Sequence, residues 1–153
     1  MAEKVNLIPN RREALGIKVV SWFHRIAYSL TGGRLLGVVA GAPVLLLTTT
    51  GNRTGKQRTK PLLYLMEDGA YVVVASYAGR HSNPAWYRNL QSHPGALIQV
   101  NNRRLRVKAE TVPAETRAGL WPKLTSMYPG YADYQARTRR EIPVVILKPA
   151  DRT

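Results

Sequence analysis

Residues 50–58 combine two glycines, two threonines and three cations without a single acid. Guanidinium and ammonium groups neutralise oxyanions, hydroxyls donate to them, and glycine lets backbone amides approach a ligand closely. The segment is not a P-loop, because its glycines stand one residue too close together and Gln57 follows the lysine. The pattern predicts an anion-binding loop, with a solvated basic turn as the alternative. The glycines are Gly51 and Gly55, the hydroxyls belong to Thr50 and Thr54, and the cations are Arg53, Lys56 and Arg58.

A second segment, residues 75–90, reads as a strand, a glycine-containing loop and a capped helix. The run from Ser82 to Pro84 supplies a helix cap and a first-turn proline, so the first helical amides can favour a second anionic group. Trp86 and Tyr87 follow directly. Their rings can stack on a ligand or pack into the core, and the sequence leaves both readings open.

Three tyrosines, Tyr128, Tyr131 and Tyr134, recur at a spacing of three residues. On a helical turn this spacing brings the phenols near one face. Such a stripe either packs in the core or forms an aromatic wall with hydroxyl donors for an apolar ligand that carries oxygen. Both interpretations stay open.

Other kinds of chemistry find no support in the sequence. There is no cysteine, and His24, His81 and His93 lack metal-ligand spacing, so we expect no metal site. The nine acids are scattered and show no acid–base pair. No Gly-x-Ser-x-Gly elbow and no Gly-x-Gly-x-x-Gly turn occur, which removes the warrant for a serine hydrolase or a Rossmann domain.

Length and charge further limit the class of protein and the kind of partner. The chain has 153 residues, 44% of them hydrophobic, which is enough for one domain with its own core. Lys and Arg outnumber Asp and Glu by 23 to 9, so the formal net charge is +14. This field favours an anionic partner such as nucleic acid, an acidic membrane face, or a phosphate- or carboxylate-bearing ligand.

After Pro43 the pattern predicts six strands and two helices that must position these segments. Glu67-Asp68-Gly69 and Asn101-Asn102 read as tight turns, so the sheet should be mainly antiparallel and the class α+β. A helix should run from the Ser82–Pro84 cap to about Gln91, and another from Pro113 to Trp121, where Pro122 should break it. The expected strands are Val44–Thr50, Thr59–Met66, Ala70–Ser76, Ala96–Asn101, Arg103–Thr111 and Val144–Lys148.

Residues 13–30 carry a helical stripe of apolar residues beside several cations. This basic amphipathic helix can pack on its own domain or lie on anionic lipid. We expect no cleaved signal, since the first twelve residues are polar. We also expect no membrane span, because the longest apolar stretch, residues 35–47, is broken by Gly37, Gly41 and Pro43. A cytoplasmic location follows by default.

The three segments resemble the deazaflavin-dependent nitroreductase family of actinobacteria, split β-barrel reductases that use coenzyme F420. The resemblance covers residues 43–149, and it implies an N-terminal helix and linker at residues 1–42 and a split-barrel domain at residues 43–153. The residues that carry it are Leu47-Thr48-Thr49-Thr50-Gly51, Gly55, Arg58, Pro61, Leu62, Ala75-Ser76, Gly79, Asn83-Pro84, Trp86-Tyr87, Asn89-Leu90, Trp121-Pro122, Met127-Tyr128-Pro129, Tyr131, Tyr134 and Ile142-Pro143.

This resemblance implies hydride transfer from reduced F420 to an electron-poor acceptor: a quinone, an activated enone or a nitro compound. The cofactor does that chemistry, which accounts for the missing acid–base pair. Its phosphodiester and glutamate tail would meet the basic loop. The implied cofactor-binding residues are Asn52, Arg53, Thr54, Gly55, Lys56, Arg58, Pro61, Leu62, Leu63, Ala75, Ser76, Tyr77, Asn83, Trp86 and Tyr87.

The resemblance also implies roles at the acceptor. Ser76 would orient the acceptor or the cofactor through a hydrogen bond, and Trp22 would act as a lid. The three tyrosines Tyr128, Tyr131 and Tyr134 would form the acceptor wall. Tyr77 stands where a Lys is common, and Leu63 stands where the best-known nitroreductase branch has a Tyr. We therefore rank quinones and enones above nitroimidazoles.

Two other classes remain as alternatives. One is a flavin- or haem-binding split barrel, since one fold hosts many sites. The other is a nucleic-acid-binding barrel that uses the basic strand 103–108, although this strand lacks interleaved aromatic residues, and we expect no nucleic-acid partner. We expect a monomer in preference to a dimer. The N-terminal helix resembles the membrane-associating segment of some family members, so peripheral contact with the inner face of the cell membrane is a further expectation.

Overall fold

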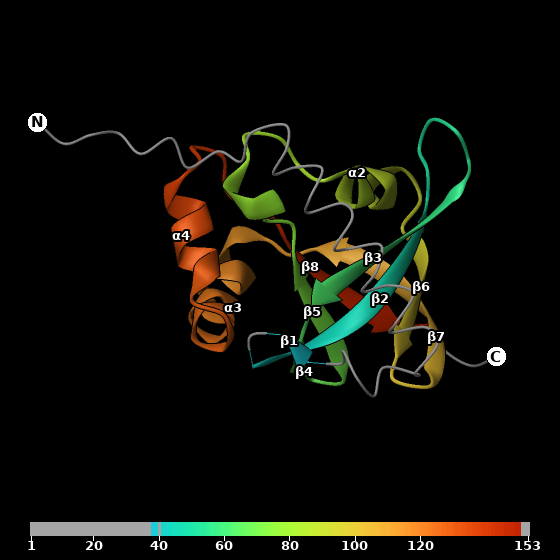
Figure 1. The fold of residues 1–153 in the computed structure, drawn as a ribbon, viewed down its shortest axis with the longest axis horizontal. Helices are drawn as coiled ribbons and strands as arrows, with labels where there is room; N and C mark the ends of the chain where they lie inside the picture. The colour runs from blue at the N-terminus through green and yellow to red at the C-terminus, as the bar shows by residue number, and fades with distance from the viewer. Residues whose placement is uncertain (1–37, 40, 151–153) are drawn as a thin grey trace, which may run out of the picture.

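An antiparallel sheet curls on itself in the computed structural model, which describes residues 38–39 and 41–150 (Figure 1). The strand order is β1-β2-β6-β7-β8-β5-β4, and β3 also pairs with β2. This confirms the expected α+β class and the antiparallel sheet of a split barrel. The strands are β1 Val38–Val39, β2 Ala42–Thr50, β3 Gln57–Leu63, β4 Leu65–Glu67, β5 Ala70–Val74, β6 Gly95–Val100, β7 Arg103–Thr111 and β8 Val144–Pro149.

The helices lie at two places around this sheet. The short 3₁₀ turn η1, Tyr77–Gly79, follows β5, and helix α2, Ala85–Ser92, follows η1. Helices α3, Ala114–Met127, and α4, Gly130–Ala136, come between β7 and β8. Figure 1 shows α3 and α4 next to each other at one flank of the sheet, away from α2.

Alternation along the strands builds two cores on opposite faces of the sheet. Val73 and Ala75 face the barrel interior, where Trp86, Tyr87 and Leu90 of α2 pack against the buried leucines of β2. Val72 and Val74 face the other way and pack against α3 and α4. Because the side-chain period of a strand is two, β5 serves both cores at once and joins the barrel to the helical flank.

The local structure follows the sequence in most places. Asp68 and Gly69 take positive φ angles of 49° and 76° in the predicted turn between β4 and β5, and Asn101 takes 52° between β6 and β7. The single strand expected over residues 59–66 is divided into β3 and β4 at Tyr64, whose amide bonds the carbonyl of Pro43.

Two expectations about helix ends are wrong. Helix α3 does not end at Trp121 but continues through Pro122 to Met127. Leu120 and Leu124 are buried on either side of the proline, and their packing outweighs its missing hydrogen bond. Helix α2 begins after Pro84, which takes the N-cap position, and no side chain caps it. Asn83 does not cap because its side-chain oxygen accepts a hydrogen bond from Arg140 instead.

The connection between β5 and α2 has an uncommon backbone. Tyr77, Ala78 and Gly79 take φ angles of 47°, 52° and 75°, so three successive residues are left-handed. Non-glycine residues in this region store conformational energy. At Gly79 a Cβ atom would lie 2.7 Å from the carbonyl oxygen of Tyr134. The backbone of α4 therefore lies directly on this turn.

We expect Gly79→Ala to destabilise the protein more than Gly69→Ala does. Both glycines have a φ near 75°, but a Cβ at Gly69 would meet nothing within 4 Å. Gly69→Ala should therefore cost only the left-handed conformation, about 1–2 kcal/mol, whereas Gly79→Ala should add overpacking of about 1–3 kcal/mol. Urea denaturation of both variants measures the difference, and equal losses would contradict the close packing of α4 on this turn.

Candidate active site

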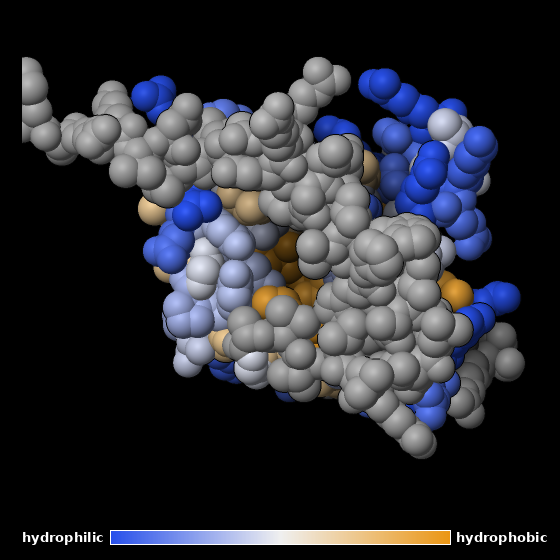
Figure 2. Space-filling view, in the orientation of Figure 1, coloured by the Kyte–Doolittle hydropathy of each residue, from blue (hydrophilic) through white to orange (hydrophobic). Residues whose placement is uncertain are grey.

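The predicted anion-binding loop connects β2 to β3 and projects its cations into solvent. Arg53, Lys56 and Arg58 are all exposed. Among residues 38–39 and 41–150, none of these three side chains forms an ion pair. Figure 2 shows a strongly polar surface over this loop and an apolar surface between the strands and the helical flank. The cations remain available for an anionic ligand.

The glycine amides of the loop close its own turn. The Gly51 amide donates to the carbonyl of Lys56 at 2.8 Å, and the Gly55 amide donates to the carbonyl of Gly51 at 2.9 Å. The Lys56 amide donates to the Thr54 hydroxyl oxygen at 3.2 Å. These three amides are therefore used inside the loop, while its cationic side chains point into solvent.

A buried asparagine holds this loop to the body of the protein. The Asn89 side-chain oxygen accepts the Asn52 amide at 3.1 Å, and the Asn89 side-chain nitrogen donates to the Thr49 hydroxyl at 3.0 Å. Asn89 and Thr49 are 5% and 2% exposed. A buried and fully paired amide fixes geometry, since any shift would leave a donor or acceptor without a partner. Helix α2 thus holds the beginning of the loop at Asn52.

Ser76 and Tyr77 occupy the beginning of the left-handed turn. The Ser76 side chain is half-buried, and within the part of the chain described here its hydroxyl makes no hydrogen bond. Tyr77 is 40% exposed, and its hydroxyl accepts a hydrogen bond from Arg80 at 3.2 Å. The Arg80 guanidinium also lies 4.8 Å from the centre of the Tyr77 ring. The structure therefore gives the segment one open hydroxyl and one fixed, exposed ring.

Arg140 binds the whole segment between β5 and α2. Its Nη2 donates to the carbonyls of Ser76 at 2.9 Å and Ala75 at 3.3 Å, and its Nε donates to the carbonyl of Arg80 at 2.8 Å. Its Nη1 donates to the Asn83 side-chain oxygen at 2.8 Å. Burial lowers the pKa of Arg140 from its usual value. This guanidinium satisfies the carbonyls of a turn that cannot pair in a sheet.

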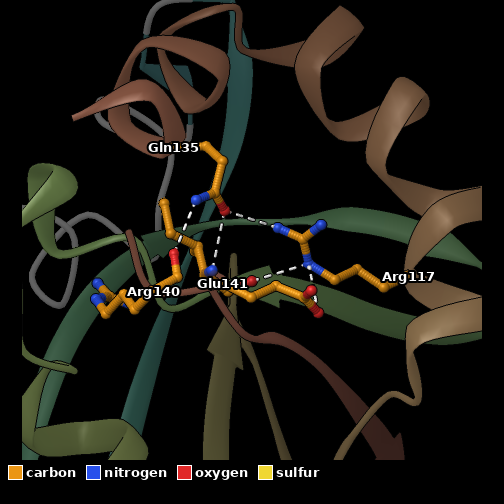
Figure 3. A network of polar contacts seen from close by, with 5 residues as sticks. Arg117, Gln135, Arg140 and Glu141 are labelled. Carbon is orange, nitrogen blue, oxygen red and sulfur yellow. Dashed lines mark hydrogen bonds and ion pairs between the residues drawn. The ribbon is translucent and has the colours of Figure 1, made fainter. Parts of the chain in front are cut away.

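The backbone of Arg140 is held in turn by a polar network (Figure 3). The Gln135 side chain of α4 donates to the Arg140 carbonyl at 2.8 Å and accepts from the Ile142 amide at 2.9 Å and from Arg117 of α3 at 3.0 Å. Arg117 also donates to the Ile142 carbonyl at 3.0 Å and lies 3.7 Å from Glu141. The network joins α3, α4 and the segment that leads into β8.

Arg117 has a second contact within the helical flank. Its guanidinium lies 4.2 Å from the centre of the Trp121 ring, a cation–π distance. Burial lowers the pKa of Arg117, and the charge of Glu141 opposes this change. Sequence reasoning missed Arg117, Gln135 and Arg140, because nothing distinguished them from the other cations and amides of a strongly basic chain.

Strand β3 presents its predicted cofactor residues on both faces of the sheet. Leu62 packs on the barrel core opposite the fully buried Leu45. Leu63 lies on the other face, where it contacts Val44 and Leu46 and also the core of the helical flank. Pro61 shares the face of Leu63 by alternation. Side chains of Pro61 and Leu63, but not of Leu62, can therefore line a site on the outer face.

The three tyrosines gather in one cluster, but from two elements. Tyr128 caps the end of α3, and Tyr131 and Tyr134 belong to α4. The Tyr128 ring centre lies 5.0 Å from that of Tyr131 and 6.1 Å from that of Tyr134. Tyr131 is 5% exposed and part of the core, whereas Tyr128 and Tyr134 are half-buried, with hydroxyls 3.2 Å apart.

Burial affects the acidity of these phenols. It raises the pKa of Tyr131, and burial together with the hydrogen bond to Tyr128 raises the pKa of Tyr134 to about 12. Both phenols therefore keep their protons at neutral pH. Tyr128 and Tyr134 can offer hydroxyl donors at the surface of the cluster, while Tyr131 supports them from below.

Several predicted site residues lie in the core or hold backbone in place. Trp86 and Tyr87 are 7% and 6% exposed, and the Tyr87 hydroxyl lies 3.0 Å from that of Thr111. Their side chains pack in the barrel core, which was one of the two interpretations that the sequence left open. Ala75 is fully buried, and the Asn83 side chain is bonded to Arg140. Trp22 and the expected helix at residues 13–30 lie outside the described residues.

Two further searches cover only residues 38–39 and 41–150. No three His, Asp or Glu side chains there come together as metal ligands. No helix in this part of the chain is long and apolar enough to cross a membrane.

The chain is similar to known reductases along most of its length. A sequence model described as F420H(2)-dependent quinone reductase matches residues 21–149. An F420H(2)-dependent quinone reductase of Mycobacterium tuberculosis is 40% identical over 128 residues, which cover 81% of this chain and 86% of the relative.

Solved structures agree with this match. The structure of an F420-H2 dependent reductase, FDR-A, is 38% identical with a TM-score of 0.64 over 69% of this chain and 94% of that chain. Another solved chain, described as a domain-swapped dimer, is 32% identical with a TM-score of 0.67 over 88% of this chain and 99% of that chain. The expectation of a monomer gains no support from this second structure. By its sequence match and its fold, this chain belongs to the F420H(2)-dependent quinone reductase family.

Proposed function

We propose that this chain reduces a quinone with the hydride of reduced coenzyme F420, and that its anionic tail lies on the β2–β3 loop. The observation that carries this placement is the loop itself: Arg53, Lys56 and Arg58 are exposed and unpaired among the described residues, and Asn89 binds the Asn52 amide of their loop. The tail of the cofactor carries a phosphodiester and glutamates. Several negative charges would thus meet three preorganised cations.

Side chains on the outer face of the sheet fit the deazaflavin ring of the cofactor and an acceptor beside it. Leu63 offers apolar contact at the edge of the helical flank, and Pro61 shares its face of the sheet. Ser76 offers a hydroxyl without a partner in the described chain. Coenzyme F420, when bound, supplies the hydride, so the protein has to bind, orient and exclude water.

The acceptor would lie against the tyrosine cluster. Burial and the hydrogen bond to Tyr128 raise the pKa of Tyr134. One hydroxyl of the Tyr128–Tyr134 pair donates to the other, so one proton is left to donate to the acceptor, and that hydrogen bond would stabilise negative charge that develops on a quinone oxygen. Ser76, at the turn that packs on α4, would orient the acceptor from the opposite side. We infer that quinones and enones fit this site better than nitroimidazoles, because Leu63 lacks a hydroxyl.

A quinone of this kind can be soluble or dissolved in a membrane. The proposal includes a cytoplasmic location with peripheral membrane contact through the helix that the sequence predicts at residues 13–30. The sequence pattern of residues 13–30 supports this part of the proposal.

Replacing the loop cations should separate binding of the tail from binding of the ring system. In the triple variant Arg53→Gln, Lys56→Gln, Arg58→Gln we expect the affinity for F420 to fall by about tenfold to a hundredfold, since three charge-assisted contacts are lost. Affinity for the deazaflavin chromophore without its tail should change little. Fluorescence titration at two salt concentrations measures both, and added salt should weaken the parent protein more than the variant.

The matched control is Arg103→Gln, Arg104→Gln, Lys108→Gln, which removes the same charge from exposed positions on β7. An equal loss in both triple variants would show that only the overall charge matters. Tighter binding of flavin mononucleotide or haem than of F420 by the parent protein would favour the alternative of a flavin- or haem-binding barrel.

Ser76→Ala should lower kcat/KM for a quinone without unfolding the protein. The loss of one hydrogen bond to the acceptor or cofactor is worth about 2–10-fold. Anaerobic oxidation of F420H2 with menadione measures the effect, and Ser126→Ala, on an exposed face of α3, is the control. Unchanged kinetics in Ser76→Ala would remove this serine from the site.

Arg140→Lys tests whether the reaction requires the segment between β5 and α2 to be held by the Arg140 guanidinium. A single ammonium cannot reproduce the planar set of four hydrogen bonds, so we expect kcat with menadione to fall by about tenfold or more. The Kd for F420 should stay within about threefold, because the loop that binds the tail is held by Asn89. Stopped-flow kinetics and titration at 10 °C separate the two quantities, with Arg104→Lys as the control. A loss of stability with unchanged kcat would contradict the positioning role of Arg140.

A further inference from the structure

A second basic surface, separate from the β2–β3 loop, lies where α4 ends. A hollow of about 450 Å³ is lined by His81, Arg137, Arg139 and Arg140 together with Ala136 and Thr138. Three arginines and a histidine therefore border one small space, and none of the residues that line it carries a carboxylate. A concave surface with one sign of charge concentrates ligands of the opposite sign.

The polar groups around this hollow leave its cations uncompensated. The carbonyls at the end of α4 are occupied, since the Arg137 amide bonds the carbonyls of Asp133 and Tyr134, and the Thr138 amide bonds that of Gln135. Glu141, next to Arg140 in the chain, is paired with Arg117 instead. Within the described residues, Arg137 and Arg139 form no ion pair.

The hollow is connected to the tyrosine cluster through Arg137. The guanidinium of Arg137 lies 5.4 Å from the centre of the Tyr134 ring, which orients it by a cation–π contact. Arg140 is held by its four hydrogen bonds, so one wall of the hollow is rigid. Arg139 is exposed and supplies a cation without a structural partner in the described chain.

We propose that this hollow binds a carboxylate, sulfonate or phosphate group, and that this group belongs to the electron acceptor. The enzyme would then prefer quinones with an acidic substituent over neutral ones of the same ring size. The assignment to the acceptor rests on the proposed function, which places the acceptor at Tyr134. The anion site itself rests only on the lining of the hollow and its charges.

The anion site is tested without cofactor or turnover. Inorganic phosphate is titrated into the full chain while the backbone amide signals of Arg139 and His81 are followed by NMR. We expect saturable shifts, with a Kd about fivefold higher in Arg139→Gln and unchanged in Arg104→Gln, which removes the same charge from β7. Absence of saturation, or the same Kd in Arg139→Gln as in the parent, would overturn the site.

The assignment to the acceptor is tested by a ratio of rates. We expect kcat/KM for 1,2-naphthoquinone-4-sulfonate divided by that for menadione to fall about fivefold in Arg139→Gln and to stay constant in Arg104→Gln. An unchanged ratio would overturn the assignment to the acceptor. So would a fivefold loss of F420 affinity in Arg139→Gln, which would assign the hollow to the cofactor tail instead. Phosphate binding without turnover of either quinone would leave the anion site in place and refute the proposed function.

Discussion

The guanidinium of Arg140 determines the shape of the candidate site. The segment between β5 and α2 contains three left-handed residues in a row and continues neither the strand nor the helix, and a buried carbonyl without a donor is costly. Arg140 places donors in one plane and reaches four acceptors on the segment between β5 and α2. These contacts hold the carbonyls of Ala75, Ser76 and Arg80 and the side chain of Asn83, and they join two parts of the chain that are far apart in sequence.

Two groups of cations among the described residues have different physical roles. Arg117 and Arg140 are partly desolvated and donate their hydrogen bonds to carbonyl and side-chain amide oxygens, so they hold parts of the fold together. Arg53, Lys56 and Arg58 remain in solvent, where their charge is free to act on a ligand. Net charge alone does not separate these roles, because the difference lies in what surrounds each guanidinium after folding.

Short-range patterns in the sequence predicted much of the fold. The strand Arg103–Thr111, the turn at Asp68-Gly69 and the loop 50–58 all follow from local alternation and turn chemistry, and the structure has them. Predictions failed where contacts between residues far apart in the sequence determine the local structure. Helix α3 passes through Pro122 because Leu120 and Leu124 are packed in the core of the helical flank.

The same limit applies to the candidate site. The spacing of the tyrosines grouped them in advance, whereas Ser76 and Leu63 entered the predicted site only through family resemblance. The sequence could not show that Leu62 and Trp86 belong to the barrel core. The residues that hold the site, Arg117, Gln135 and Arg140, have no local signature. Their partners are mostly backbone carbonyls and amides, which every residue carries, so no pairing of side-chain types marks them in advance.

The alternation of β3 places neighbouring residues in two separate environments. Leu62 contributes to the barrel interior, whereas Pro61 and Leu63 lie on the outer face. A substitution at an even position of this strand therefore acts on the barrel, and one at the next odd position acts on the opposite side of the sheet.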